Sequence, residues 1–181
     1  MKTFDAITQR RTIHFFKSGK VPNSIIKNSL VAANSAPCHK ATYPWRFNII
    51  RSKTRKLLFE EYYRIKYENK SNDQTKLELE KKYFNPSNLI IVTQILNKCT
   101  TRSKEDYAAC CCAIENLMVY LRSENIYSKW TTGKTTDSEK IYKIVGIDSD
   151  IEKIIGFIWI GYGDKPKDLE RPNVELFIRY K

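Results

Sequence analysis

Hydrophobic and polar positions recur along this chain with two different periods. In several stretches the apolar side chains return every three or four residues, which is the spacing of a helix with one buried face. Residues 53–84 are dense in Lys, Glu and Tyr and are expected to form one or two exposed helices, whereas residues 105–123 are apolar nearly all round. The predicted helices are residues 4–10, 22–36, 53–84, 105–123 and 138–145.

Short continuous apolar runs predict the strands. The runs at 88–95 and 154–161 are rich in β-branched and aromatic residues and are too short to cross a membrane, so they are expected to be buried strands. Residues 174–180 form a solitary strand pattern that must pair elsewhere, for example on another subunit. The predicted strands are residues 46–50, 88–95, 154–161 and 174–180, and residues 130–133 are predicted to be a polar turn.

Length and composition limit the class of protein. The chain has 181 residues, of which 41% are hydrophobic and 29% charged, so one domain with a real core is expected and a disordered or low-complexity chain is excluded. The formal net charge is +12, which favours contact with anions but does not choose among them. Basic and aromatic residues alternate over 51–70, as in some nucleic-acid-binding surfaces, but Glu60, Glu61 and Glu68 dilute that stretch.

The N-terminus and the cysteines point to the compartment. The first residues enter a charged pattern without the apolar stretch of a signal peptide, so a cytoplasmic location without a membrane span is expected. The five cysteines have neither CxxC spacing nor paired histidines, so we expect neither a disulfide scaffold nor a metal site. The run Cys110–Cys112 is interpreted as small core residues of a buried helix rather than a redox group.

Two short segments carry candidate chemistry. Arg10, Arg11 and Thr12 offer guanidinium groups and a hydroxyl where a helix gives way to a loop, and these are the donors that a phosphate group needs. A loop bounded by prolines, residues 37–44, holds His39 next to Lys40, an arrangement suited to a planar ligand that gains negative charge. Each segment taken alone is also compatible with an ordinary charged surface.

Taken in order, these segments resemble the nitroreductase family of FMN-dependent oxidoreductases. Arg10-Arg11-Thr12 resembles its Arg-Arg-Ser opening, and residues 36–47 resemble its Ala-Pro and Pro-Trp-x-Phe segment, most like the compact single-domain members with an Ala-Pro-x-His-Lys loop. Residues 106–121, 130–133 and 155–163 follow the family pattern in the same order. The resemblance covers nearly the whole chain and is least characteristic over residues 60–85.

The resemblance implies a fold, a cofactor and a set of site residues. The fold is α+β, a three-layer α/β/α sandwich with a mainly antiparallel central sheet, in one domain over residues 1–181 with residues 53–85 as a helical excursion. FMN is the implied cofactor and NAD(P)H the co-substrate, with flavin N5 carrying the hydride and no catalytic side chain or metal. The implied cofactor-binding residues are Arg10, Arg11, Thr12, His14, Ser35, His39, Lys40, Thr131, Thr132, Gly133 and Arg171.

The resemblance also implies a homodimer with FMN at the subunit interface, the C-terminal strand being exchanged with the partner. Two departures bear on the site: Ala41 and Tyr43 stand where many members have Asn and Gln, which removes amide donors from the flavin edge. The implied reaction is ping-pong reduction of nitroaromatic, quinone or similar acceptors. The alternatives are a flavin reductase or dehalogenase with the same fold, or a basic nucleic-acid-binding domain.

Overall fold

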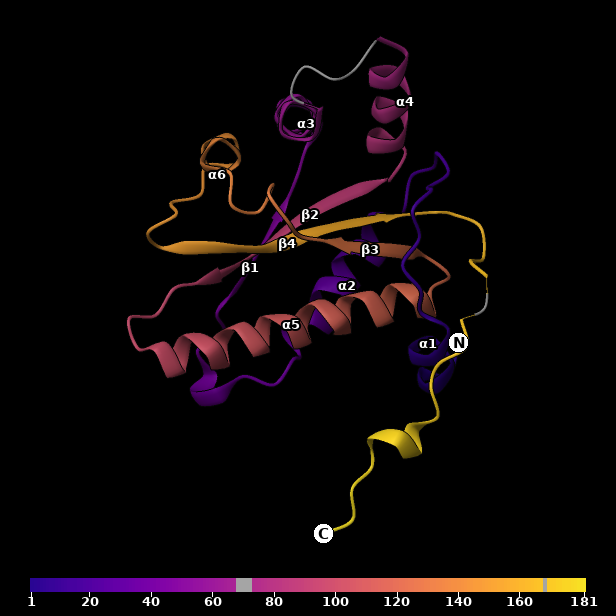
Figure 1. The fold of residues 1–181 in the computed structure, drawn as a ribbon, viewed down its shortest axis with the longest axis vertical. Helices are drawn as coiled ribbons and strands as arrows, with labels where there is room; N and C mark the ends of the chain where they lie inside the picture. The colour runs from indigo at the N-terminus through magenta and orange to yellow at the C-terminus, as the bar shows by residue number, and fades with distance from the viewer. Residues whose placement is uncertain (68–72, 168) are drawn as a thin grey trace.

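The computed structural model describes residues 1–67, 73–167 and 169–181 (Figure 1). Among these residues, no helix is both long and apolar enough to span a membrane. The helices are α1 (Thr3–Gln9), α2 (Asn23–Asn34), α3 (Ser52–Tyr67), α4 (Asp73–Phe84), α5 (Thr100–Ser123) and α6 (Glu139–Val145), with 3-10 turns η1 (His39–Ala41) and η2 (Val174–Phe177). The strands are β1 (Trp45–Ile49), β2 (Asn88–Ile95), β3 (Tyr127–Thr131) and β4 (Glu152–Gly161).

The four strands form one sheet in the order β1-β2-β4-β3, and every pairing is antiparallel. The continuous apolar runs become the two central strands, where Leu89 and Ile90 on β2 are fully buried. Such strands read as unbroken hydrophobic stretches because both of their faces are covered. The expected antiparallel sheet is therefore confirmed.

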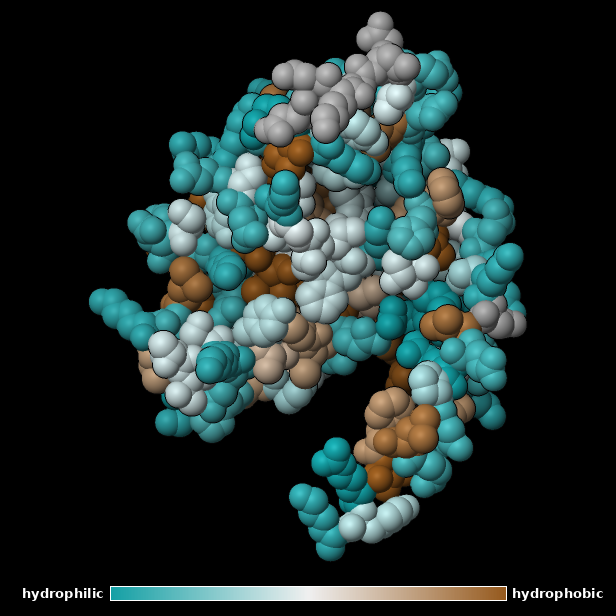
Figure 2. Space-filling view, in the orientation of Figure 1, coloured by the Kyte–Doolittle hydropathy of each residue, from teal (hydrophilic) through white to brown (hydrophobic). Residues whose placement is uncertain are grey.

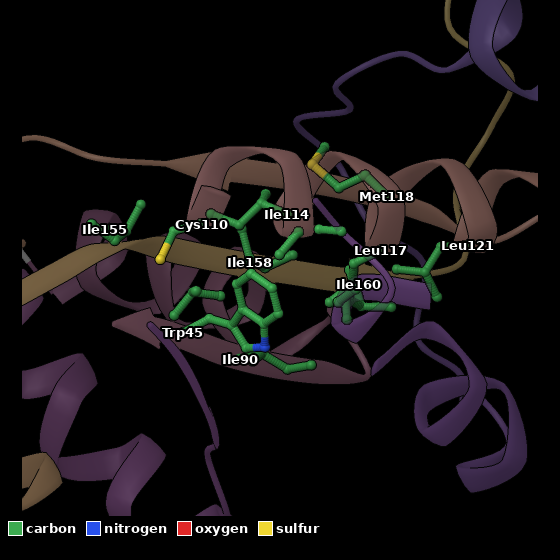
Figure 3. Close-up of a cluster of buried hydrophobic side chains, with 14 of the residues drawn as sticks. Trp45, Ile90, Cys110, Ile114, Leu117, Met118, Leu121, Ile155, Ile158 and Ile160 are labelled. Atoms are coloured by element: carbon green, nitrogen blue, oxygen red, sulfur yellow. The ribbon is translucent and has the colours of Figure 1, made fainter. Parts of the chain in front are cut away.

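Helices cover both faces of the sheet and give the expected three layers. In Figure 1, α2 and α5 lie on one face, and α3, α4 and α6 lie on the other. Figure 3 shows the core on the α5 side, where Ile114, Leu117 and Leu121 pack toward Trp45 and the strands. A second core, centred on Phe59 and other aromatic residues, lies on the opposite face.

Three sequence predictions are wrong. Residues 130–131 are not a turn but the end of β3, whose mixed sequence Tyr-Ser-Lys-Trp-Thr lacks the apolar run of a central strand because β3 is at the sheet edge. α5 begins at Thr100 and buries one face, so it is not apolar all round, and of the cysteine run only Cys110 is buried while Cys112 is exposed. All five cysteines are free thiols.

The third error is the strand predicted at residues 174–180. Val174–Phe177 forms a 3-10 turn, and the Asn173 side chain caps it by accepting a hydrogen bond of 3.1 Å from the Glu175 amide. A strand needs a neighbour for its ladder, and no strand in the described part of this chain supplies one. The segment extends away from the body as an arm, on which Leu176 and Phe177 are 75% and 71% exposed (Figure 2).

A buried carboxylate ties α3 to the start of α6. The Glu61 side chain is 0% exposed and forms ion pairs with Arg64 at 2.6 Å and Lys140 at 3.0 Å. Ser138, which precedes α6, donates a hydrogen bond of 3.2 Å to the same carboxylate. Hydrogen bonds from Arg64 outweigh the cost of burial and, together with Lys140, lower the pKa of Glu61 from 4.5 to about 2.

This lowered pKa predicts an acid-dependent contribution to stability. Because the folded-state pKa of Glu61 is below its unfolded value, its contribution is complete above about pH 4.5 and is lost as the pH falls toward 2. We expect Glu61→Gln to reduce the loss of unfolding free energy between pH 5 and pH 3, measured by urea denaturation. Glu60→Gln, on the exposed face of the same helix, is the control, and an equal effect of both substitutions would contradict the assignment.

Candidate active site

The predicted phosphate-binding residues lie where α1 ends. Arg10 caps the helix and pairs through Nε with Glu115 on α5 at 2.9 Å. Arg11 donates from Nη1 to the carbonyl oxygens of Thr8 at 2.8 Å and Arg10 at 2.9 Å, while its Nε is buried without a hydrogen-bond partner. Thr12 then bridges in parallel to Ser128 at the start of β3. A guanidinium with a free donor beside a hydroxyl fits an anionic ligand.

Beyond this segment the chain passes a cleft with a cavity of about 240 Å³. His14 and Phe16 line one side, the helices α3 and α4 form a second wall, and the end of β3 forms the floor. Four basic residues contribute to the lining, namely His14, Lys66, Lys82 and Lys129, together with Thr131, Thr132, Tyr62, Tyr83 and Trp159. None of the described residues that line this cleft is acidic.

Two lysines of this cleft have pKa values shifted in opposite directions. Burial lowers the pKa of Lys129, and the nearby charges of Lys82 and Lys66 lower it further. Partial burial also works against the Lys66 ammonium, but hydrogen bonding and attraction to Tyr62 and Tyr67 outweigh it and raise the pKa of Lys66. An anion bound near Lys129 would offset the repulsion from Lys82 and Lys66.

An exposed turn closes the end of β3 beside the cleft. Trp159 Nε1 donates to Thr131 Oγ1 at 3.0 Å and so fixes the last residue of the strand. Gly133 follows with φ of 110°, a conformation that favours glycine, and its carbonyl accepts bonds from the Thr136 amide at 2.8 Å and hydroxyl at 2.7 Å. Because Gly133 has no side chain and nothing lies within 4 Å of the position that its Cβ would take, the backbone of this turn is open to a ligand.

The loop that carries His39 and Lys40 lies elsewhere. It is anchored by the Thr42 hydroxyl, which donates to Asp106 on α5 at 2.7 Å. Its backbone is unusual, since Lys40, Ala41 and Tyr43 all have positive φ, between 44° and 54°. Non-glycine residues in this region are strained, and such strain concentrates at functional sites.

The two groups of predicted residues stand at opposite ends of α5. The loop is bound at Asp106, whereas Arg11 lines a small hollow with Arg122, near the other end of the helix. Sixteen helical positions separate these two anchor points, which is roughly 24 Å at 1.5 Å per residue. Figure 1 shows the same separation, with α1 beside one end of α5. One chain therefore does not gather all of the predicted residues around one ligand.

The structure sorts the predicted residues into three groups. Arg10, Arg11, Thr12, His14, Thr131, Thr132 and Gly133 lie along the segment beside β3 and around the cleft. Ser35, His39 and Lys40 belong to the loop end, where the exposed Ser35 caps α2 and its hydroxyl donates to the Val31 carbonyl at 3.0 Å. Arg171 is exposed at the start of the C-terminal arm, two residues after Leu169, whose carbonyl oxygen accepts a hydrogen bond of 3.5 Å from Arg11 Nη2.

Sequence reasoning missed Lys66, Lys82 and Lys129. Two of them belong to helices whose many lysines look like a solvated surface, and the third lies in the strand that was not predicted. Trp159 is half-buried and lines the cleft, whereas Trp45 is buried in the core. Had β3 been predicted as a strand, Lys129 could have been placed beside Thr131. Alternate residues of a strand lie on the same face, so Lys129 and Thr131 point the same way.

The fold and these clefts define a class of protein. The model of the Nitroreductase family matches residues 7–162, so the chain belongs to the nitroreductase family. The resemblance drawn from the sequence motifs is confirmed, and with it the expected class of enzyme, a nitroreductase-type oxidoreductase. A curated relative from Bacillus subtilis (strain 168), named "Putative NAD(P)H nitroreductase YfhC", is 28% identical over 172 residues, which is 92% of this chain and 87% of the relative.

Solved structures share the fold over nearly the whole chain. A nitroreductase-like family protein from Bacillus cereus has a TM-score of 0.84 at 20% identity, covering 100% of this chain and 96% of its own. An iodotyrosine deiodinase crystallised with FMN and 3-iodo-L-tyrosine has a TM-score of 0.73 at 25% identity, covering 99% of each chain. A Desulfovibrio desulfuricans protein in complex with FMN has a TM-score of 0.76 at 17% identity, covering 100% and 98%.

The strained loop gives a prediction about stability. Ala41 has φ of 51°, which costs an L-residue about 1–2 kcal/mol but costs glycine nothing. We expect Ala41→Gly to raise the free energy of unfolding of the protein freed of bound ligands by up to about 1 kcal/mol, measured by urea denaturation. Ala32→Gly, inside α2, is the control and should lower it by about 1 kcal/mol. A lowered stability of Ala41→Gly would show that the loop is not strained in solution.

Proposed function

We propose that this chain is an FMN-dependent oxidoreductase that oxidises NADH or NADPH and reduces nitroaromatic, quinone or similar acceptors. The observation that carries the proposal is the arrangement beside β3, where Arg10, Arg11 and Thr12 lead into a cationic cleft that ends at an exposed backbone turn. Family membership, and relatives that are named for NAD(P)H or hold FMN, support the same reading.

The residues present fit the proposed cofactor. The unpartnered Arg11 Nε and the Thr12 hydroxyl suit the phosphate, and the cleft with the Thr131–Gly133 turn suits the ring. When bound, FMN supplies hydride chemistry that amino-acid side chains cannot perform. The protein has to orient the ring and stabilise the negative charge that reduction adds, and Lys129, the half-buried cation at the floor of the cleft, is placed to do so.

A homodimer is part of the same proposal. The loop with His39 and Lys40 is about 24 Å along α5 from the Arg11 hollow, so it would serve a site on a second copy of the chain. The C-terminal arm exposes Leu176 and Phe177, and apolar side chains of that size are usually covered in the native assembly. We propose that the arm lies on the partner and that FMN sits where the two chains meet.

Reductive dehalogenation is a second candidate activity. The iodotyrosine deiodinase shares 25% identity with this chain over 99% of its length, so reductive dehalogenation of an aromatic compound is the alternative that the comparisons favour. Both activities would use the same flavin, and the acceptor distinguishes them. A flavin reductase, whose electron acceptor would be a second, free flavin, is the third candidate within the same fold.

The test is an absorbance spectrum of the purified protein between about 300 and 550 nm, repeated without oxygen after NADH or NADPH is added. We expect a flavin spectrum that bleaches and then recovers when a nitroaromatic or a quinone is supplied. Recovery with 3-iodotyrosine and release of iodide would favour the dehalogenase instead. A protein that neither contains nor takes up FMN would contradict the proposal and would favour the alternative of a basic nucleic-acid-binding domain.

The arm predicts how the assembly responds to truncation. Removing residues 173–181 would expose the surface that these side chains cover on the partner, so we expect a lower dimer stability and a lower FMN content per chain. The dissociation constant of the dimer and the flavin stoichiometry measure both effects. The triple substitution of Glu175, Arg179 and Lys181 by Ser keeps the apolar side chains and is the matched control. A truncated protein that stays a flavin-loaded dimer would refute the role of the arm.

A further inference from the structure

The cleft holds more positive charge than a flavin requires. Reduction adds one negative charge to the ring, and the phosphate is placed at Arg10–Thr12, outside the cleft. Lys129 already stands at the floor next to the turn, yet Lys66 and Lys82 add two more ammonium groups to the same lining. Neither of these two lysines forms an ion pair with a described acidic residue.

Both lysines are exposed, and the ammonium group of each contacts aromatic rings beside the cleft. Lys66 Nζ donates to the Tyr62 hydroxyl at 3.2 Å and stands 5.5 Å from the centres of the Tyr62 and Tyr67 rings. Lys82 Nζ lies 4.6 Å from the centre of the Phe15 ring. Aromatic contacts of this kind orient an ammonium group without neutralising it, so its positive charge remains available.

A second cavity continues from the first at this rim. It has a volume of about 390 Å³, and Lys66, Lys82, Phe16 and Leu79 line both cavities. Phe15, Tyr67 and Lys81 complete its walls with Thr75, Asn85 and Glu78, the last of which accepts a hydrogen bond of 3.2 Å from Gln74. Aromatic side chains and the two ammonium groups therefore line neighbouring cavities.

On this ground, and resting on the proposed function, we propose that Lys66 and Lys82 form an anion subsite and that the electron acceptor is an aromatic acid. The carboxylate, sulfonate or phosphate of the acceptor would lie between the α3 and α4 lysines at the rim, and its aromatic ring would lie deeper in the cleft. A bound anion would offset the repulsion that Lys82 and Lys66 exert on Lys129 at the floor of the cleft.

The experiment compares two acceptors that differ in charge but little in size, 4-nitrobenzoate and 4-nitrobenzamide. For each, kcat/KM is measured with NADH as donor, and the dissociation constant from the protein as purified is measured by calorimetry. We expect the wild type to prefer the benzoate, and we expect Lys66→Met and Lys82→Met each to lower the benzoate-to-benzamide ratio about tenfold, in turnover and in binding. Lys66→Arg retains the charge and should keep most of the preference.

Lys56→Met is the matched control, because Lys56 lies on α3 but faces the groove on the other side of α4. It should leave the ratio at the wild-type value. An equal loss in this control would show a general effect of surface charge and would overturn the subsite, as would a wild type without any preference. If either Met variant fails to fold, the wild-type ratio must still fall with rising ionic strength.

Two further outcomes distinguish the acceptor subsite from a donor-binding site and from the proposed function. The lysines would instead serve the 2′-phosphate of the donor if Lys66→Met lowered the NADPH-to-NADH ratio of kcat/KM and left the acceptor ratio unchanged, and that result contradicts the inference. Lysine-dependent binding of 4-nitrobenzoate without any turnover would uphold the subsite and refute the oxidoreductase proposal. The anion subsite and the oxidoreductase function are therefore contradicted by different results.

Discussion

Helix α5 sets the distance between the two groups of candidate ligand-binding residues on one chain. Its 24 residues pack one face against the sheet through a continuous apolar stripe, so it is held straight across the width of the fold (Figure 3). The loop with His39 and Lys40 is tied to Asp106 near one end, and Arg10 is tied to Glu115 further along. A rigid helix cannot bring these anchors together. The chemistry predicted for one site is therefore divided between two places on each chain.

Charged side chains distinguish the helices on the opposite face of the sheet. Glu61 is buried with two cations and a hydroxyl, so its negative charge is fully compensated and it joins α3 to α6. On the same helix, Lys66 projects into a cleft that offers no described carboxylate in return. One helix thus carries a satisfied ionic cluster that supports the wall of the cleft and an exposed cation that has no described carboxylate partner in the cleft. This difference between Glu61 and Lys66 is the physical reason to regard the cleft, rather than the rest of the surface, as the candidate ligand-binding site.

The sequence predicted the central strands and most helices because their signals are local. The run at Asn88–Ile95 is apolar on both faces, and Gly146 ends α6 in the left-handed conformation expected of a C-terminal glycine. The predictions failed where a partner decides the structure. β3 is an edge strand of mixed composition, and the C-terminal segment has no strand beside it within the described part of one chain. The motif residues were found from their order, but Lys66 and Lys82 could not be, since only the packing of α3 and α4 places them together.

The most direct test of this account asks whether one binding site draws on two chains. One variant carries Arg10→Ala and Arg11→Ala, and the other carries His39→Ala and Lys40→Ala, so each is disabled in a different half. Co-expressed, the two should form mixed dimers that contain one intact and one doubly altered site. If chains pair at random, about one site in four would bind FMN with wild-type affinity, although neither variant does so alone. Mixtures that bind no more FMN than the separate variants would show that each chain builds its own site and would contradict the account.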